Sequence, residues 1–150
     1  MFRKSRRQYP DHFISRKLCI RKSDVHGIGV FAAEPIEAHE LIEASPVILF
    51  HMDTAEALTD FFGVRHVLMD YPFQWNGTTL AFALGFGGIY NHLTRRPNAG
   101  WKCNFETESL DFYSRCAIPA GDEIFIRYLS HYQMDRLWFY ESNEKDVPDK

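Results

Sequence analysis

Hydrogen-bonding and aromatic side chains are concentrated in the segment Gly87–Trp101, which reads GGIYNHLTRRPNAGW. Asn91 and His92 can each donate and accept hydrogen bonds, and the glycines before them let the backbone approach a ligand closely. The Pro97-Asn98 pair predicts a turn that directs Trp101, a rigid aromatic, onto the next strand. Because His92 has no second ligand at a metal-binding spacing, we expect no zinc site. Taken alone, His92 and Trp101 are more often structural residues than parts of a site.

Two further stretches could contribute to a binding site. His26–Ala32 (HGIGVFA) places two glycines around one residue ahead of an apolar strand, where backbone amides can meet a polar or anionic group. A dinucleotide-binding loop would need a third glycine and a following helix, so that ligand is disfavoured. Glu123–Tyr128 (EIFIRY) is an alternating strand that ends on a tyrosine, whose hydroxyl can face a site. Singly, a hairpin turn and a tyrosine between core and solvent are the ordinary explanations.

The order of these stretches is far more specific than any one of them. Together they resemble the SET domain of protein-lysine methyltransferases, over residues 18–132. His26–Ala32 is similar to the Gly-x-Gly start of that family, and Ile89–His92 with Pro97-Asn98 is similar to its Asn-His-Ser-x-x-Pro-Asn core. Glu123–Tyr128 is similar to its closing Glu-Leu-x-x-x-Tyr strand. The minimal, free-standing SET proteins of bacteria and viruses are the nearest comparison, since the protein has too few cysteines for the zinc modules that often flank the domain.

The resemblance implies that S-adenosylmethionine is the cofactor. The backbone of Ile28 and Gly29 would meet its methionine part. The segment formed by Tyr90, Asn91 and His92 would lie on its adenine side. Trp138 or Phe139, on an expected C-terminal helix, would cover it as a lid.

The resemblance also implies transfer of a methyl group to the ε-amine of a lysine in a protein substrate. Tyr128 would be the catalytic tyrosine that aligns methyl group and amine. Trp101 would line the lysine channel and help to set how many methyl groups fit. A narrow aromatic channel beside a cationic sulfonium lowers the pKa of the substrate amine by desolvation and like charge, and aromatic walls also attract methylated ammonium.

Three departures from the family pattern leave a second interpretation open. Leu93 replaces a small polar residue after Asn-His, the gap before Pro97 is one residue longer than in most members, and Arg127 stands where a small or acidic residue is commoner. With these changes the protein could be a SET-type interaction module that binds cofactor or basic partners without turnover.

Turn signals between many short apolar segments predict a mostly β protein of the α+β class. The resemblance makes this the SET (β-clip) fold of small twisted sheets, with the C-terminal segment tucked beneath a preceding loop as a pseudoknot. The local patterns predict strands at Leu18–Lys22, Ile28–Ala33, Thr78–Leu84 and Glu123–Tyr128, a strand pair over Leu41–Phe50 interrupted by Pro46, a hairpin of Trp101–Thr107 with Leu110–Ala117, and helices at Thr54–Val67 and His131–Glu141.

Length and composition fit one globular domain. The chain has 150 residues, of which 45% are hydrophobic and 25% charged. Its three cysteines lack CxxC spacing, so no disulfide framework is expected. No apolar run is long enough for a membrane span, and the basic N-terminus has no following apolar stretch. We therefore expect a protein that is neither membrane-bound nor secreted, located in the cytoplasm, or in the nucleus of a eukaryotic host.

Charge is unevenly distributed along the sequence. Residues 1–22 hold eight basic side chains and one acidic one, so they carry +7, and the remaining residues must carry −10 to give the net −3. We expect three regions: a basic arm over residues 1–17, the SET domain over 18–132, and a helix with a polar tail over 133–150. The arm could contact nucleic acid or be a solvated terminus. The acidic body would attract a lysine-rich substrate, such as a histone-like or ribosomal protein. A homodimer that completes the groove is a further expectation.

Overall fold

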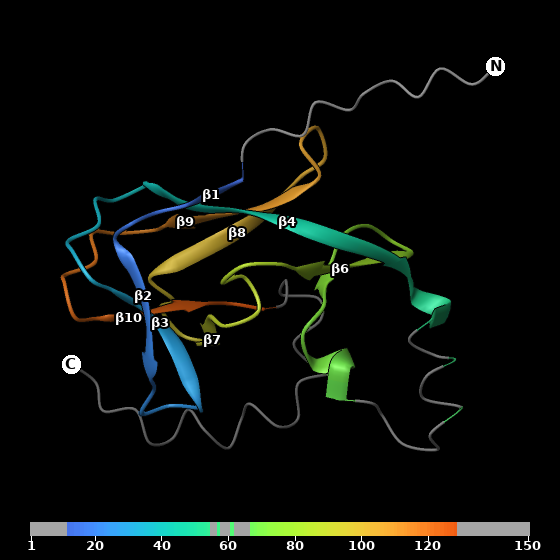
Figure 1. Ribbon diagram of the computed structural model, residues 1–150, viewed down its shortest axis with the longest axis horizontal. Coiled ribbons are helices and arrows are strands. Elements are labelled where there is room, and N and C mark those ends of the chain that lie inside the picture. Colours follow the sequence, from blue (N-terminus) through green and yellow to red (C-terminus); the bar gives the residue numbers. More distant parts are fainter. Residues whose placement is uncertain (1–11, 55–56, 58–60, 62–66, 129–150) are drawn as a thin grey trace.

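The computed structural model describes residues 12–54, 57, 61 and 67–128. In these parts short strands dominate, as the sequence predicted, and one short 3-10 helix, η1 (Val67–Asp70), precedes the middle strands. Figure 1 shows the strands wrapped around a common interior. The strands are β1 (Phe13–Ile14), β2 (Leu18–Lys22), β3 (Ile28–Ala32), β4 (Leu41–His51), β5 (Phe73–Gln74), β6 (Thr79–Ala83), β7 (Asn91–His92), β8 (Ala99–Asn104), β9 (Ser109–Ser114) and β10 (Glu123–Ile126).

The strands form two sheets. The larger sheet has the order β5-β6-β4-β9-β8, with β1 paired to the edge of β4 that also binds β6. The smaller sheet has the order β2-β3-β10-β7. Its last strand, β10, lies between β3, to which it is antiparallel, and β7, to which it is parallel. This insertion of a late strand between two earlier ones is the described part of the expected pseudoknot, and it carries the end of β10 into the middle of the molecule.

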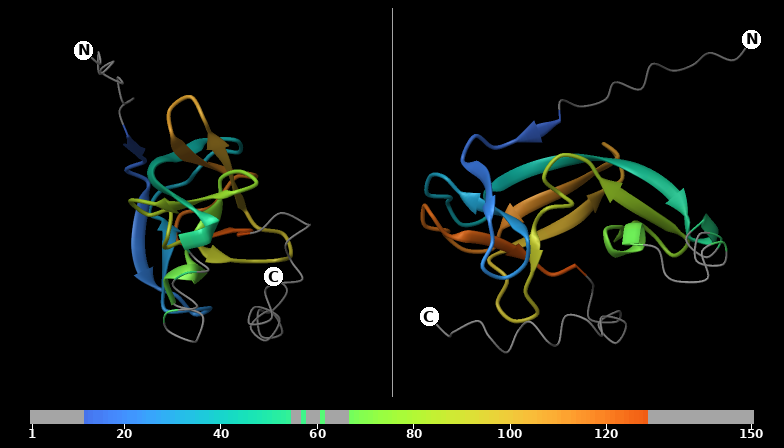
Figure 2. Two further views of the ribbon diagram at one scale, coloured as in Figure 1. Left: turned by 90° about the vertical axis from the view of Figure 1, so that its right-hand side faces the viewer. Right: turned by 60° about the horizontal axis from the view of Figure 1, so that its bottom comes forward.

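The segment Leu41–Phe50 was expected as two strands separated by Pro46, and this was wrong. The structure has one continuous strand, β4, which arches over the molecule (Figure 2, right). Pro46 has no N–H to donate, but its C=O accepts from the Leu84 N–H at 2.8 Å. The Leu84 C=O accepts from the Ser45 hydroxyl instead of from a backbone N–H at position 46. The neighbouring hydroxyl therefore replaces the missing ladder bond, and the strand passes through the proline.

A β-bulge lies at the beginning of β4. The register against β9 shifts between Leu41 and Glu43. As a result Ile42 and Glu43, which are adjacent in sequence, are both fully buried. The bulge is the reason why an acidic side chain of this strand is directed into the molecule.

Of the other secondary-structure predictions, the strands are confirmed and the helices lie mostly or entirely outside the described residues. Strands at residues 18–22, 28–32, 79–83 and 123–126 and the hairpin of β8 and β9 are confirmed. The helix expected at Thr54–Val67 lies mostly outside the described residues; within it, residues 54, 57 and 61 are helical. The helix expected at His131–Glu141 lies entirely outside them.

The interior is built from both sheets. Aliphatic side chains of the smaller sheet and its turns meet aromatic side chains of the larger one, and Tyr90 lies fully buried between them. The largest fully buried apolar side chains are Tyr90, Phe112, Ile36, Ile42, Leu110, Ile118, Ile124 and Ile126.

Candidate active site

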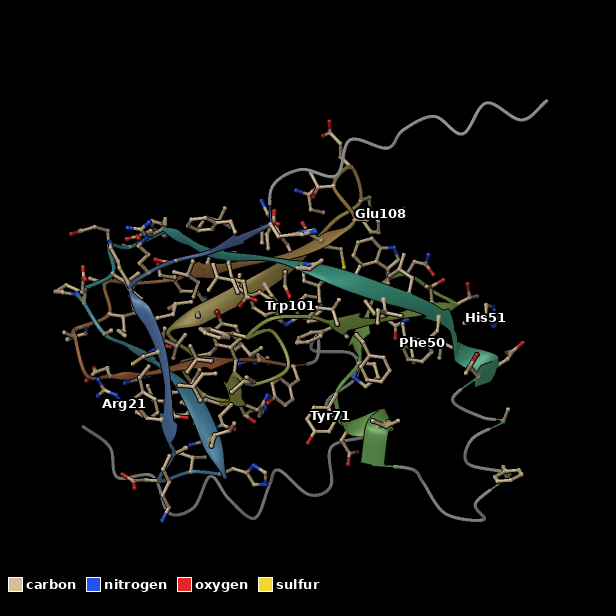
Figure 3. All side chains as sticks on the ribbon, in the orientation of Figure 1. Arg21, Phe50, His51, Tyr71, Trp101 and Glu108 are labelled. Atoms are coloured by element: carbon tan, nitrogen blue, oxygen red, sulfur yellow. The ribbon has the colours of Figure 1, made fainter. Side chains whose placement is uncertain are left out.

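One row of side chains crosses three strands of the larger sheet. Trp101 on β8 is the register partner of Phe112 on β9, which is in turn the partner of Glu43 on β4. Register partners project from the same face of a sheet, so this row forms one wall of the interior. The Trp101 side chain lies near the centre of the molecule, whereas Glu108, in the β8–β9 turn, lies at its edge (Figure 3).

Phe73 joins this wall from β5. Its ring meets the rings of Trp101 at 4.9 Å and Phe112 at 5.8 Å, and that of Tyr128 at 6.2 Å, edge to face in each case. Edge-to-face contacts of this kind hold aromatic rings in defined orientations. The wall is therefore a rigid aromatic surface. It includes Trp101, predicted to line the lysine channel, and Tyr128, predicted to be the catalytic tyrosine.

Tyr128 is held at both ends. Its backbone N–H donates to Nδ1 of His92 at 3.0 Å, and its hydroxyl donates to the backbone C=O of Tyr90. Its ring lies 5.2 Å from that of His92. The pairing of β10 with β7 places Tyr128, just after β10, beside both partners.

The hydrogen bonds of His92 define its protonation. Since Nδ1 accepts from the Tyr128 N–H, the neutral ring carries its proton on Nε2, which donates to the Thr94 hydroxyl at 3.0 Å. The Thr94 C=O accepts from the Arg127 guanidinium. A series of contacts thus runs from Tyr128 through His92 and Thr94 back to the residue before Tyr128.

This series of contacts explains two of the departures from the family pattern. The lengthened loop has Arg96 in the left-handed region, with a φ of 51°. Arg127 binds the loop at Thr94, and the Leu93 N–H donates to the Ile126 C=O at 3.0 Å, so pairing with the smaller sheet continues past β7. The loop is therefore anchored to the segment that ends in the predicted catalytic tyrosine.

Trp101 is fixed to the same segment. Its indole N–H donates to the Arg127 C=O at 2.7 Å, and the side chain is half-buried. The indole is therefore held beside Tyr128 with its orientation set by one hydrogen bond and by the Phe73 ring.

The Gly-x-Gly stretch meets the Asn-His stretch at Asn91. The Asn91 amide donates to the C=O groups of His26 and Ile28, both at 3.1 Å, and to Oε1 of Glu123 at 2.7 Å. A Cβ on Gly29 would lie 3.0 Å from the Asn91 amide nitrogen and 2.9 Å from the Glu123 carboxyl carbon. Gly29 is therefore required for close packing of this junction, whichever ligand its backbone meets.

Asn98 fixes the strand that carries this carboxylate. Its amide nitrogen donates to the Glu123 C=O, and its Oδ1 accepts from the Phe125 N–H, both at 2.8 Å. Asn98 thus substitutes for a neighbouring strand along the start of β10. This is what the Pro-Asn turn contributes to the site.

Glu43 lies beneath the segment that leads to Asn91. It is fully buried, with Oε2 accepting from the Tyr90 hydroxyl and Oε1 from the Phe86 N–H, both at 2.9 Å. Burial raises the pKa of the Glu43 carboxyl, although its hydrogen bonds oppose the shift. Burial, and then the carboxylate, raise the pKa of the Tyr90 phenol well above its ordinary value.

The structure brings together most of the residues singled out in the sequence. Tyr90, Asn91, His92, Trp101 and Tyr128 lie around one centre. Ile28 and Gly29 reach it through Asn91, whereas Trp138 and Phe139 lie outside the described residues. Sequence reasoning missed Phe73 and Glu43 entirely, and it quoted Glu123 and Asn98 only as parts of motifs. A signal for Glu43 existed, since it is the only acid within the otherwise uncharged run Leu41–Phe50.

The chemistry of this centre fits a sulfonium donor. The Tyr128 hydroxyl and the Tyr90 C=O place two oxygens side by side among aromatic rings, and such an electron-rich surround favours a positively charged group. Among the described residues, no group of three His, Cys, Asp or Glu side chains could hold a metal ion, and no helix is long and apolar enough to cross a membrane. All three cysteines are free thiols.

Comparisons with known proteins agree with this fold. The SET domain family matches residues 27–129, so the chain belongs to the SET-domain family and is an enzyme of the SET methyltransferase class. A curated relative from Schizosaccharomyces pombe, a histone-lysine N-methyltransferase specific for H3 lysine 37, is 36% identical over 126 residues. These make up 84% of this chain and 79% of the relative.

Solved structures also resemble the protein. A Plasmodium falciparum protein assigned as a histone methyltransferase has a TM-score of 0.62 and 27% identity, over 79% of this chain and 99% of that one. A component of the Chaetomium thermophilum Polycomb Repressive Complex 2 has a TM-score of 0.58 and 23% identity, over 74% of this chain and 14% of that one. The latter likeness concerns the fold alone. The SET fold inferred from the motifs is confirmed.

Proposed function

We propose that the protein transfers a methyl group from S-adenosylmethionine to the ε-amine of a lysine in a basic protein, with histones as the first candidates. The observation that carries the proposal is the fixed position of Tyr128. Its hydroxyl donates to the Tyr90 C=O, its backbone N–H donates to Nδ1 of His92, and its ring contacts Phe73 in the aromatic wall. The relative's specificity for histone H3 supports the choice of substrate class.

The cofactor side of the site would lie where the Gly-x-Gly stretch meets Asn91. There the backbone of Ile28 and Gly29 and the segment Tyr90–His92 offer amides and carbonyls, and Ile28 is more than half exposed. When bound, S-adenosylmethionine supplies an electrophilic methyl group on a positively charged sulfur. Trp138 and Phe139 remain the proposed lid.

The lysine side would be the aromatic wall of Trp101, Phe73 and Tyr128. These rings exclude water from an entering amine, and desolvation disfavours the ammonium form, so the pKa of the amine falls. The neutral amine has the lone pair that attacks the methyl carbon, and the Tyr128 hydroxyl orients it. No described side chain is placed as a dedicated base, and we propose that the amine proton leaves to water before transfer.

Transfer of labelled methyl groups to core histones and to a mixture of ribosomal proteins tests this function. We expect Tyr128→Phe to lower kcat by about a hundredfold or more, because the hydroxyl that aligns the reacting groups is lost while the ring remains. Binding of S-adenosylmethionine, measured by calorimetry, should stay within about threefold of the wild type, which separates alignment from cofactor binding.

Tyr113→Phe is the matched control. Tyr113 is half-buried on β9, and none of the site contacts above involves its hydroxyl. Equal turnover in the Tyr128 and Tyr113 variants would remove Tyr128 from the mechanism. If the wild type binds S-adenosylmethionine but methylates no protein in the panel, the result would favour the interaction-module interpretation.

Partners and location are part of the same proposal. A lysine-rich protein substrate is consistent with the acidic character of residues 23–150. We propose a cytoplasmic location, or a nuclear one in a eukaryotic host. We also propose that the basic arm contacts nucleic acid. Homodimerisation stays a proposal, tested by sedimentation.

A further inference from the structure

Glu43 is the one described acidic side chain that is completely buried, and the proposed reaction gives it no role. It projects from β4 because of the bulge after Leu41, on the same face as Phe112 and Trp101. Burying a carboxylate costs free energy unless its oxygens are well bonded. We therefore expect the hydrogen bonds of Glu43 to hold a particular part of the structure in place.

Both carboxylate oxygens bind the segment that leads to the Asn-His pair. Oε1 accepts from the Phe86 N–H and Oε2 from the Tyr90 hydroxyl, both at 2.9 Å. Gly85, with a φ of +79°, turns the backbone so closely over the carboxylate that a Cβ there would lie 2.7 Å from Oε1. The carboxylate thus fixes both ends of the segment 85–90.

Tyr90 transmits this fixation to the reaction centre. Its ring is stacked on Phe112 at 4.8 Å with an interplanar angle of 29°, and its hydroxyl is bonded to Glu43. With ring and hydroxyl both held, the backbone of Tyr90 has little freedom. The C=O of this same residue accepts the hydroxyl of Tyr128. Glu43 and Tyr128 are therefore connected through one residue, although they bind opposite ends of it.

We propose that Glu43 is a positioning residue for methyl transfer: its carboxylate holds the segment 85–90 so that the Tyr90 C=O directs the Tyr128 hydroxyl toward the reacting groups. The inference rests on the proposed function and adds a residue to it that touches neither cofactor nor substrate. It also accounts for a fully buried acid on β4.

The test compares Glu43→Leu with Glu43→Gln. Glutamine keeps the shape of the side chain: its C=O can accept from the Phe86 N–H, and its amide can donate to the Tyr90 hydroxyl oxygen. Leucine keeps the apolar volume but can make neither bond. We expect Glu43→Leu to lower kcat by about tenfold or more with KM and cofactor affinity within about threefold, and Glu43→Gln to restore most of kcat.

A second readout does not depend on turnover. In protein labelled at the ζ carbon of tyrosine, the Tyr128 NMR signal, assigned with Tyr128→Phe, reports the hydrogen bond of its hydroxyl. We expect this signal to move in Glu43→Leu, although Glu43 does not touch Tyr128, and to return in Glu43→Gln. Tyr90→Phe, which leaves β4 unchanged, should move it in the same direction if Glu43→Leu does not fold.

Asp111→Leu is the matched control. Asp111 is a buried carboxylate on the neighbouring strand, bonded to Asn104 and Ser109, and it projects to the face opposite Phe112. Its loss costs packing and hydrogen bonds of the same kind but should move neither the Tyr128 signal nor the ratio of kcat to KM. Equal effects of the Glu43 and Asp111 variants, or an unmoved Tyr128 signal with unchanged kcat in Glu43→Leu, would overturn the proposal. Failure of the wild type to methylate any protein would overturn the proposed function instead, and the NMR comparison would still decide whether Glu43 positions Tyr128.

Discussion

Tyr128 is fixed by three separate contacts. Its backbone, hydroxyl and ring each have a different partner, namely His92, Tyr90 and Phe73. In the proposed reaction the hydroxyl aligns the amine, and the other two contacts hold the ring in place for this. Orientation, more than acid–base strength, is thus the contribution expected from this side chain.

The buried carboxylate of Glu43 leads to a prediction about stability and pH. Burial raises its pKa in the folded protein above the ordinary value of 4.5. Between these two pKa values the folded state binds more protons than the unfolded state, so the free energy of unfolding falls as pH rises through this window. Glu43→Gln removes the titration. We expect the variant to gain stability relative to the wild type from pH 4.5 upward, measured as the difference between their thermal midpoints.

Glu40 provides a control of opposite sign. Its hydrogen bond from Lys17, at 2.8 Å, lowers the pKa of the Glu40 carboxyl, and the contribution to stability is therefore lost as pH falls through the folded pKa. The wild type should exceed Glu40→Gln at neutral pH, by a small margin because solvent screens this partly exposed pair, and the margin should close in acid. A difference between wild type and Glu43→Gln that stays constant from acid to neutral pH would contradict the raised pKa.

The sequence could predict the residues of the site whose types and spacing are local signals. Asn91, His92 and Tyr128 stand in short motifs, and the structure brings them together. Glu43 could not be found in this way, because the bulge that turns it inward breaks the alternation by which buried and exposed positions of a strand are recognised. Phe73 lies on a strand of two residues, which is too short to give a periodic signal.

At the scale of elements, β10 depends on side chains as much as on neighbouring strands. Only two register pairs join it to β3 and two to β7. Asn98 adds two hydrogen bonds to its backbone, and the Glu123 carboxylate is bonded to Asn91 and Ser23. The inserted strand is therefore fastened by the conformation of the 91–98 loop.

This leads to a prediction for Asn98. We expect Asn98→Ala to lower the free energy of unfolding by about 2 kcal/mol, because the Phe125 N–H and the Glu123 C=O both lose their partner. Asn98→Asp retains an acceptor for the Phe125 N–H and should lie between alanine and the wild type. Urea unfolding of the three proteins measures the order. A loss in Asn98→Ala below about 0.5 kcal/mol would mean that the loop does not hold β10.

Local patterns predicted most strands but not their partners. Alternating apolar residues and turn signals identified β2, β3, β6, β10 and the β8–β9 hairpin, since each signal lies within a few residues. The parallel pairing of β10 with β7 joins segments far apart in the sequence, and only the family resemblance pointed to it. The continuity of β4 through Pro46 could not be predicted locally, because the Ser45 hydroxyl that replaces the missing N–H bonds to Leu84, just after β6.

At the scale of the whole molecule, charge is separated along the sequence. Residues 1–22 carry +7 and residues 23–150 carry −10, so the part that contains most of the site is acidic. A lysine-rich substrate would be attracted to this part before any specific contact forms, and the attraction would decay over a Debye length of about 8 Å at physiological salt. The chemical step, shielded among the aromatic rings, would feel the salt much less.

Salt should therefore act on substrate capture and not on transfer. Raising the ionic strength from about 0.05 M to about 0.3 M should raise KM for a histone substrate severalfold, while kcat stays within about twofold. A short peptide whose target lysine is flanked by uncharged residues is the matched control, and its KM should change much less. The measurement is a set of steady-state curves for both substrates at several salt concentrations. Parallel changes in kcat, or an equal change in KM for both substrates, would show that long-range charge does not guide the substrate, and recognition would then lie in the contacts immediately around the aromatic wall.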